Sequence, residues 1–565
     1  MLGKRSLQVK LFAPETRLRK KIGEESFYVF LADHRHELFS DEDFGMLYCK
    51  DNGRNSVPPS LLATALILQT FDRVSDQEAT DRALFDQRWH LALGVSDEEM
   101  PFAKSTLCTF RNQLIIHKRA KFLFQKGIEH LRRHGFVKKH KIQLALDTTA
   151  IFGKGAVEDT FNMLAEGLRQ VLRVLAELTL QTPESFAAAH DFSRYLAPSF
   201  KGTCCIDWDN ETERQVVLDS LVADCERVLV LASSTLKEYA AESEQAKQIL
   251  QATDLLSKLL AQDVRRNPDE MGGKVEIIDG VAQNRIVSVH DPEMRHGRKS
   301  ASQRFDGYKA SVAVETDSQM ITDVDVLPAN AHDSTNASSV VAESTENLEA
   351  VVEDVLGDGA YGTVEARLDA RTGGYTITSP VGRLSQTGRF TKDDFAIDLE
   401  NNTVACPAGQ TTSTWYVRHT KTSRGTIFTH RSFSFSVKQC RGCSLRAKCL
   451  KPETSHRAVL VHEQEALLQE AKAFQRTDEY RARYRKRVVV EHRIARLTRL
   501  GIRKARYFGS AKVLFQLAMA ATVANLTLFA TSVSSSAGFV KSFIRKVLQT
   551  IIIVSRNNYG SIESA

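Results

Sequence analysis

The stretch KIQLALDTTAIFG, residues 141–153, decides the fold. Ile142, Leu144 and Leu146 alternate with other side chains at the period of a half-buried β-strand, and Asp147 follows directly. Further strand patterns occur at KVEIIDG (274–280), RIVSVHD (285–291), YKASVAVET (308–316) and MITDVDVLPA (320–329). Helical periodicity surrounds them, so the expected fold class is α/β.

A second acidic residue stands at the end of another short apolar run. Asp358 lies between two glycines in LGDGAYG, residues 356–362, where a strand is expected to hand over to a turn. Strand ends of this kind often carry functional carboxylates in α/β sheets. Asp325, Asp333 and Asp354 are nearby alternatives, but the glycine-flanked setting favours Asp358.

The third acidic residue sits in the most basic part of the chain. Between Arg481 and Lys512 there are twelve Lys or Arg residues and one acidic residue, Glu491. In YRKRVVVEHRIARLTRL, residues 484–500, Tyr484, Arg487 and Glu491 have the spacing i, i+3 and i+7, which predicts one helix face. A surface helix with salt bridges is the alternative, but a single Glu among twelve cations favours a phosphate-binding surface.

Three carboxylates of this kind suit phosphoryl transfer. Two Mg²⁺ ions about 4 Å apart can activate a water or 3′-hydroxyl, stabilise the leaving oxygen and neutralise charge at phosphorus. Mg²⁺ prefers hard oxygen ligands and keeps several waters, so a few carboxylates suffice. We therefore expect Asp147, Asp358 and Glu491 to be catalytic and to bind two Mg²⁺ or Mn²⁺ ions.

These motifs resemble the DDE transposases of bacterial insertion sequences, in the group with a β-strand insertion before the catalytic Glu. The resemblance rests on Asp147 in LALDTTAIFGKGAVEDTFNML, Asp358 in LGDGAYG and the Tyr-x2-Arg-x3-Glu signature of residues 484–491, and it covers about residues 40–530. One departure concerns the Lys or Arg that follows the Glu by seven residues in that group. Thr498 occupies this position, and the neighbouring Arg499 is the candidate substitute.

The resemblance implies an RNase H-like catalytic core with a mixed five-stranded sheet. It also implies an N-terminal domain that recognises terminal inverted repeats, target DNA as the second partner and a homodimer in the DNA complex. The expected division is a helical N-terminal DNA-binding domain (1–137), the first part of the core (138–155 and 275–395) with a helical insertion (156–274), a β-rich insertion (396–460), the C-terminal core helices (461–531) and a tail of unknown role (532–565).

Four of the nine cysteines lie in the expected β-rich insertion: Cys406, Cys440, Cys443 and Cys449. The Cys-x2-Cys pair can present two thiolates to one metal, and the other two cysteines can complete a structural zinc site. Reduced, metal-free cysteines are the alternative. Arg298 and Lys299, in the basic segment MRHGRKS, are expected to contact DNA phosphates, with a solvated loop as the alternative.

The bulk composition limits the remaining possibilities. The 565 residues are 42% hydrophobic and 26% charged, with a net charge of +7, as in a soluble multidomain protein. No secretory signal is evident, and the apolar run 515–531 is interrupted by polar residues, so we expect a cytoplasmic, nucleoid-associated bacterial protein without a membrane span. The alternatives to an active transposase are a catalytically silent DNA-binding relic or repressor at element ends and an RNase H-fold nuclease.

Overall fold

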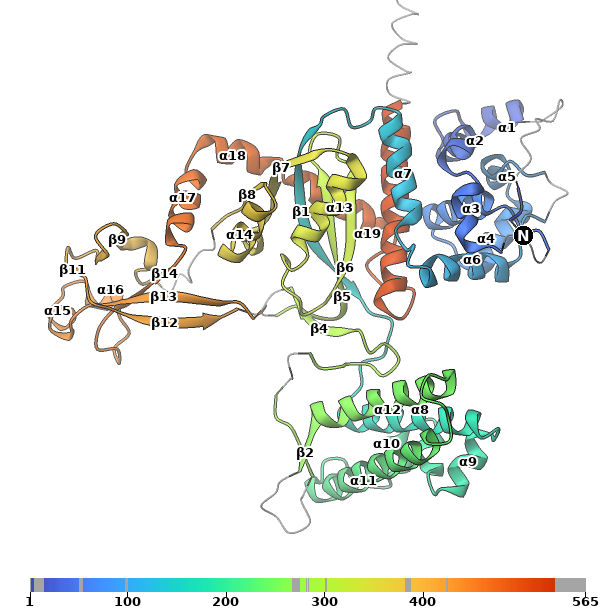
Figure 1. The fold of residues 1–565 in the computed structure, drawn as a ribbon, viewed down its shortest axis with the longest axis horizontal. Helices are drawn as coiled ribbons and strands as arrows, with labels where there is room; N and C mark the ends of the chain where they lie inside the picture. The colour runs from blue at the N-terminus through green and yellow to red at the C-terminus, as the bar shows by residue number, and fades with distance from the viewer. Residues whose placement is uncertain are drawn as a thin grey trace, which may run out of the picture.

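The computed structural model describes residues 2–4, 15–49, 54–96, 100–266, 275–280, 282, 284–299, 302–381, 388–422 and 425–533. A β-sheet lies at the centre, with the N-terminal helices on one side, a β-rich extension on the other and a separate helical block beyond the end of the sheet (Figure 1). The expected tail, 532–565, lies almost wholly outside the described residues.

The N-terminal part is helical, as predicted. Pro59 begins one of its helices, where a missing backbone N–H costs nothing, and Ser75 and Glu78 form a capping box at the start of the next. Trp89 is fully buried among these helices. They are α1 (Glu15–Ile22), α2 (Phe27–Leu38), η1 (Glu42–Leu47), α3 (Pro59–Asp72), α4 (Asp76–Phe85), α5 (Gln87–Leu93), α6 (Lys104–Ile116) and α7 (Phe122–Arg133).

The central sheet is mixed and five strand positions wide. Its strands are β1 (Lys141–Phe152), β4 (Arg295–Arg298), β5 (Arg304–Glu315), β6 (Ile321–Pro328), β7 (Val351–Leu356) and β8 (Thr376–Thr378). β1 pairs antiparallel with β5 and parallel with β7, and β8 continues parallel beyond β7. Strand β5 pairs with β1 on one side. On its other side it pairs with β4 through residues 304–307 and with β6 through residues 308–314, so β4 and β6 follow each other along one strand position. The predicted mixed five-stranded sheet is confirmed.

One predicted strand is absent from the described structure. The segment RIVSVHD, residues 285–291, has no strand pairing, although Val287 and Val289 are buried. Ile286 and Ser288 are buried as well, so four consecutive residues pack inward without strand pairing. The strand prediction for this segment was therefore wrong.

Helices cover the sheet and carry the chain between its strands. They are α13 (Ala337–Leu348), α14 (Val364–Thr372), α19 (Val488–Arg499) and the long helix Ser510–Val533. This last helix is apolar and long enough to cross a membrane by composition alone, but 78% of its apolar window is buried inside the protein. Asn525 explains its register, because its side-chain amide bonds both the N–H and the C=O of Ile321 at the start of β6.

The helical block has a core of its own. Phe161, Leu221 and Leu256 are among the buried residues that one apolar cluster joins across its three longest helices. The block contains α8 (Thr160–Leu178), α9 (Pro183–Ala189), η2 (Ser193–Leu196), α10 (Phe200–Thr203), α11 (Glu211–Leu236), α12 (Glu244–Asp263) and the strand pair β2 (Val264–Arg266) and β3 (Val275–Ile277). Strand β2 falls within a stretch for which helical periodicity was predicted.

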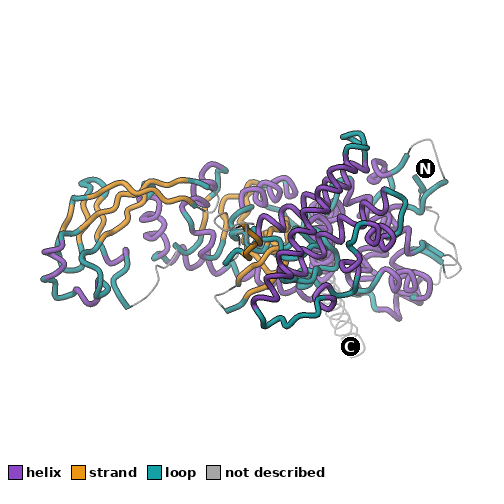
Figure 2. Tube along the Cα trace, turned by 90° about the horizontal axis from the view of Figure 1, so that it is seen from below, coloured by secondary structure: helices purple, strands orange, loops and turns teal. Residues whose placement is uncertain are grey.

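The β-rich extension projects away from the central sheet, and Figure 2 shows its strands gathered apart from those of the core. It contains β9 (Ala396–Asp398), β10 (Thr403–Ala405), β11 (Thr411–Thr412), β12 (Trp415–Lys421), β13 (Ile427–Ser434) and β14 (Ala458–His462), with η4 (Lys392–Asp394), α15 (Val437–Arg441) and α16 (Arg446–Cys449). Helices α17 (Glu465–Gln475) and α18 (Asp478–Arg485) lead back to α19 at the sheet (Figure 1).

Candidate active site at the centre of the sheet

Asp147 and Asp358 lie beside each other on neighbouring parallel strands. The β1–β7 register aligns Ala145 with Leu356, so two residues further on Asp147 is level with Asp358. Neighbouring strands are about 4.8 Å apart. The two acidic residues, 211 positions apart in sequence, therefore meet at the same edge of the sheet.

Backbone N–H groups orient both aspartates. The Thr148 N–H donates to Asp147 Oδ1 over 2.8 Å. The Ala360 N–H donates to Asp358 Oδ1 over 2.9 Å, which caps the short helix η3 (Gly359–Gly362). The strand-to-turn transition predicted at Asp358 therefore positions its carboxylate directly.

Arg487 connects the third acidic residue to the first. Its Nη1 donates to Glu491 Oε1 over 2.6 Å, and its Nη2 lies 3.4 Å from Asp147 Oδ2. The guanidinium is 14% exposed, whereas Glu491 is 56% exposed. Glu491 is therefore on the solvent-exposed side of the site. Arg487 is more buried and contacts both Glu491 and Asp147 on β1.

The predicted single helix for Tyr484, Arg487 and Glu491 is wrong. Tyr484 is on α18, Glu491 is in the first turn of α19, and Arg487 lies between the two helices. Here the backbone tightens to i→i+3 bonds, because the N–H of Arg487 donates to Tyr484 and that of Val490 donates to Arg487. Three consecutive β-branched valines follow this turn, and such residues favour a regular α-helix less than straight-chain residues do.

The three side chains still converge on the two aspartates. Tyr484 stacks on Tyr480 with ring centroids 5.4 Å apart, and the charges of Asp147, Asp358 and Glu491 all act on its hydroxyl. Burial raises the pKa of Tyr484, and Arg487 opposes that shift. A kinked pair of helices therefore delivers the Tyr, Arg and Glu of the motif to one place.

The electrostatics of Asp147 reflect this crowding. Burial and, to a smaller extent, the charges of Asp358 and Glu491 raise the pKa of Asp147 to about 6, although Arg487 and the Thr148 N–H oppose the shift. Like charges and desolvation both disfavour a buried carboxylate. At neutral pH the site holds negative charge that a cation would stabilise.

Two further residues lie at the site. Both belong to sequence motifs described above, but neither was predicted as a site residue. Tyr361 is fully buried beneath the aspartates, its hydroxyl has no hydrogen-bond partner within the described structure, and burial raises its pKa far above the usual value. It occurs in the same GDGAYG motif as Asp358. Arg503 belongs to the basic run, and its guanidinium donates to the Thr149 hydroxyl over 3.2 Å, two residues along β1 from Asp147.

Three residues predicted to bind DNA lie away from the acidic residues. Arg298 ends β4 and pairs with Arg304, which is eight residues along β5 from the partner of Asp147, or about 27 Å. Arg298 and Lys299 are both exposed. Arg499 is exposed at the end of α19, eight residues and about 12 Å along the helix from Glu491.

The four cysteines of the expected zinc site gather at one end of the β-rich extension. Burial raises the pKa of the Cys449 thiol, and the other three cysteines, Cys406, Cys440 and Cys443, raise it further through their charges. Cys406, Cys440 and Cys449 pack against the same small apolar core. The predicted grouping is present, although no three of these thiols lie within 4.8 Å of one another.

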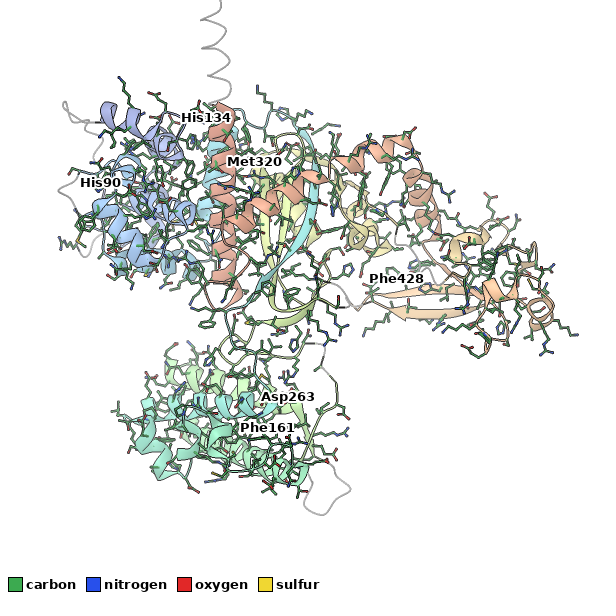
Figure 3. All side chains as sticks on the ribbon, turned by 180° about the vertical axis from the view of Figure 1, so that it is seen from behind. His90, His134, Phe161, Asp263, Met320 and Phe428 are labelled. Atoms are coloured by element: carbon green, nitrogen blue, oxygen red, sulfur yellow. The ribbon has the colours of Figure 1, made fainter. Side chains whose placement is uncertain are left out.

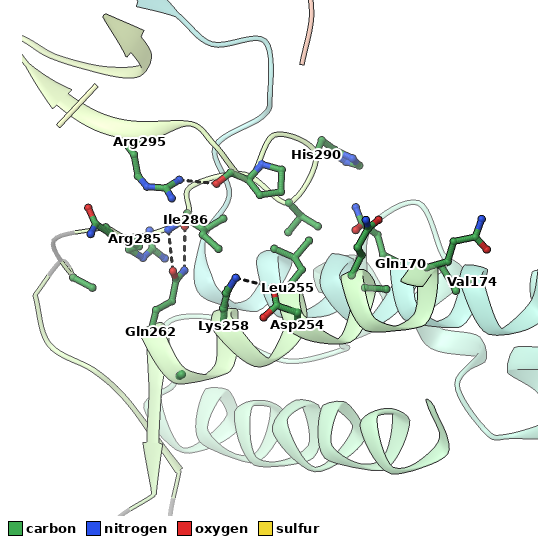
Figure 4. A pocket seen from close by; sticks show the side chains of 18 of the residues that line it. Gln170, Val174, Asp254, Leu255, Lys258, Gln262, Arg285, Ile286, His290 and Arg295 are labelled. Carbon is green, nitrogen blue, oxygen red and sulfur yellow. Dashed lines mark hydrogen bonds and ion pairs between the residues drawn. The ribbon is translucent and has the colours of Figure 1, made fainter. Parts of the chain in front are cut away.

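A cavity of about 1050 Å³ lies remote from the acidic residues. Figure 4 shows that α8, α12 and the segment around Arg285 to Arg295 line it. Its polar groups largely satisfy each other, because Lys258 pairs with Asp254 over 2.6 Å and Gln262 bonds the backbone of Ile286. It marks the join between the helical block and the core.

Comparison with known families agrees with this geometry. Residues 405–529 match the model described as a transposase DDE domain, and residues 16–113 match the model of the transposase domain DUF772. The chain carries the DDE domain of a transposase. DNA transposition is therefore its function, phosphoryl transfer its chemistry and DNA its substrate, and such transposases generally use divalent metal ions.

No curated protein and no solved structure matches the chain. The DDE match begins after Asp147 and Asp358 and includes Glu491. An RNase H-like core is consistent with this transposase domain and with the mixed sheet.

Proposed function

We propose that Asp147, Asp358 and Glu491 are the catalytic carboxylates of this transposase. The observation that carries the proposal is their convergence: strand register aligns the two aspartates, and Arg487 contacts both Asp147 and Glu491. The three residues come from β1, the turn after β7 and α19, which are separate parts of the chain. A salt-bridge network that only stabilised the fold would not require two adjacent aspartates, with the pKa of Asp147 raised.

The residues fit a pair of divalent ions. All three side chains offer the hard oxygen ligands that Mg²⁺ and Mn²⁺ prefer, and burial together with the neighbouring acidic charges raises the pKa of Asp147. When bound, two such ions activate the attacking oxygen and stabilise the leaving oxygen of the phosphodiester. The carboxylates hold these ions, and the protein's cations position the DNA backbone around them.

Arg487, Tyr484 and Arg503 have the chemistry for that positioning. A guanidinium binds phosphate through two parallel N–H donors, and a phenol donates to phosphate or stacks on a base. Arg487, whose guanidinium contacts both Asp147 and Glu491, would donate to a phosphate oxygen of DNA bound at this site. Arg499, Arg298 and Lys299 contact the duplex further from the reacting phosphate, which matches their distance along α19 and β5.

The finer assignments follow from this core. The mixed sheet supports an RNase H-like core in which β1 carries Asp147 and the turn after β7 carries Asp358. The N-terminal helices recognise terminal inverted repeats, and two copies of the chain assemble on the DNA ends. The protein acts at the nucleoid of a bacterial cell, as a transposase of the insertion-sequence group with a β-strand insertion before the catalytic Glu.

The β-rich extension holds a structural zinc ion through Cys406, Cys440, Cys443 and Cys449. Cys440 and Cys443 flank a glycine-containing turn, and Cys449 ends α16, so short flexible segments carry three of the four thiols. The four thiols must move closer together to bind one ion. Four thiolates leave no open coordination position, so this ion supports the fold and takes no part in transposition chemistry.

The test is cleavage of a labelled duplex that carries the DNA flanking the gene, in Mg²⁺ or Mn²⁺. Wild type and the matched variant Glu479→Gln, an exposed change on α18, should cut at the element boundary and join the ends to target DNA. Asp147→Asn and Glu491→Gln should abolish both steps while retaining end binding.

Three results would contradict the proposal. Binding without cleavage by wild type in every divalent metal would support a silent DNA-binding relic. Cleavage independent of terminal repeats would support a nuclease. Full activity of Glu491→Gln would remove Glu491 from the site.

A further inference from the structure

A second cluster of metal-ligating side chains lies on α2 and α7, remote from the three acidic residues. Helix α2 contributes two residues with the spacing i, i+3, and α7 contributes two with the spacing i, i+4. Both spacings place the side chains on one helix face. The four residues, named the His3Glu cluster below, are His34, Glu37, His130 and His134.

The ligand atoms of the His3Glu cluster are already close together. Glu37 Oε2 lies 3.4 Å from His134 Nε2, 3.5 Å from His34 Nδ1 and 4.0 Å from His130 Nδ1. The ligand atoms all lie within 4.8 Å of one another. In a tetrahedral zinc site with bonds of about 2.0–2.1 Å, neighbouring ligand atoms are about 3.3 Å apart. Small rotations of the side chains would complete that geometry.

Hydrogen bonding prepares the rings as ligands. His134 Nδ1 lies 3.0 Å from the backbone oxygen of His130, and donation to this carbonyl leaves the His134 Nε2 lone pair free for a metal. The buried His34 Nδ1, which lies 3.5 Å from Glu37 Oε2, has no hydrogen-bond partner within the described structure. Unpaired buried nitrogens cost free energy, and metal coordination would recover part of it.

Salt bridges from protonated histidines to Glu37 do not explain why these four side chains lie together. A salt-bridge cluster around Glu37 would require positively charged imidazoles side by side, with ring centroids of His130 and His134 only 4.3 Å apart. His130 is 1% exposed, and burial disfavours a positively charged imidazole there. Neutral imidazole is the form that binds metal.

We propose that the His3Glu cluster binds a structural zinc ion that joins α2 to α7. Three imidazoles and one carboxylate supply the four ligands of a closed tetrahedral site, and imidazole suits zinc among the common divalent ions. Four protein ligands leave no position for substrate, so the ion stabilises the fold.

The surroundings indicate what the ion would hold together. The Phe529 ring, on helix Ser510–Val533, meets the rings of His34, His130 and His134 edge-on. Figure 3 shows His134 beside this long helix. On its open side the cluster borders a cavity of about 360 Å³. The ion would therefore fasten the N-terminal helices to α7 at the point where the long C-terminal helix packs.

The experiment measures zinc and cobalt binding by the full-length protein. Wild type should bind one zinc ion that Glu37→Gln and His134→Gln each weaken by more than about 100-fold, because changes beyond the ligands already cost about 10–100-fold. Glu129→Gln is the matched control, since Glu129 lines the same cavity but is not a ligand. Added zinc should raise the Tm of wild type and of this control by more than that of Glu37→Gln, which keeps the cysteines.

Cobalt distinguishes this ion from one held by the cysteines. Cobalt-loaded protein should show tetrahedral visible absorption from nitrogen and oxygen ligands, and Glu37→Gln should remove it while any thiolate-to-cobalt charge-transfer band remains. Equal zinc affinity of Glu37→Gln and Glu129→Gln would overturn the proposal. So would cobalt absorption that arises from thiolates alone.

Discussion

Arg487 controls the charge balance at the proposed catalytic carboxylates. Its guanidinium contacts Asp147 and Glu491, is 14% exposed, and its Nε has no partner in the described structure. A buried cation among carboxylates lowers their pKa and keeps them ionised, which is the form that binds divalent ions. Arg487 therefore prepares the site for metal while occupying the space between its carboxylates.

Replacing Arg487 should raise the pKa of Asp147. In metal-free Arg487→Gln the pKa of Asp147 should rise above its value of about 6, by roughly one unit or more, because the nearest opposing charge is lost. Carbon-13 NMR titration of labelled aspartate carboxyls, assigned with Asp147→Asn, measures it. The exposed change Arg481→Gln should leave that pKa unchanged. A lower pKa in Arg487→Gln would contradict the argument.

Neutralising Asp147 should stabilise the metal-free protein. Because the folded-state pKa of about 6 exceeds the usual aspartate value of 3.8, ionisation opposes folding above pH 6, and this penalty fades as pH falls from 6 towards 3.8. Asp147→Asn should gain up to about 3 kcal/mol at pH 7.5 and progressively less below pH 6. Urea denaturation with chelator at several pH values measures the difference. A less stable variant at pH 7.5 would show that Asp147 is structurally required.

At the level of secondary-structure elements, local sequence patterns predicted the strands better than the break between two helices or the contacts between distant helices. The alternation in residues 141–153 gave β1, and the glycine-flanked Asp358 gave the turn after β7, because both depend on neighbours in sequence. The break between α18 and α19 was missed, since tertiary packing tightens that turn. The His3Glu cluster was missed because its two helices are about ninety residues apart and neither contains a complete ligand set.

The junction of β1, β4 and β5 should depend on Gly307. Its φ is +147°, and a Cβ there would lie 2.2 Å from the backbone oxygen of Ile151. Gly307→Ala should cost about 1–3 kcal/mol of folding free energy, because both strands would have to move. Gly45→Ala is the control, since Gly45 has space around it. Equal denaturation midpoints for the two variants would contradict this reading.

On the scale of the whole molecule, the helical block is a unit with its own buried core. Phe161, Leu256 and Ile286 belong to one apolar cluster that excludes the central sheet. A fragment spanning residues 157–291 should therefore fold alone, with helical circular dichroism and a cooperative thermal transition. A broad, non-cooperative transition would show that the block needs the core to fold.

The position of β1 has a consequence for biosynthesis. This central strand requires β7, about two hundred residues later, and the site requires Glu491 later still. Contacts of such sequence separation form slowly, and a growing chain with its central strand exposed is prone to aggregation. The ribosome must have released nearly the whole chain before the three acidic residues meet. Incomplete translation products would therefore lack the proposed catalytic site.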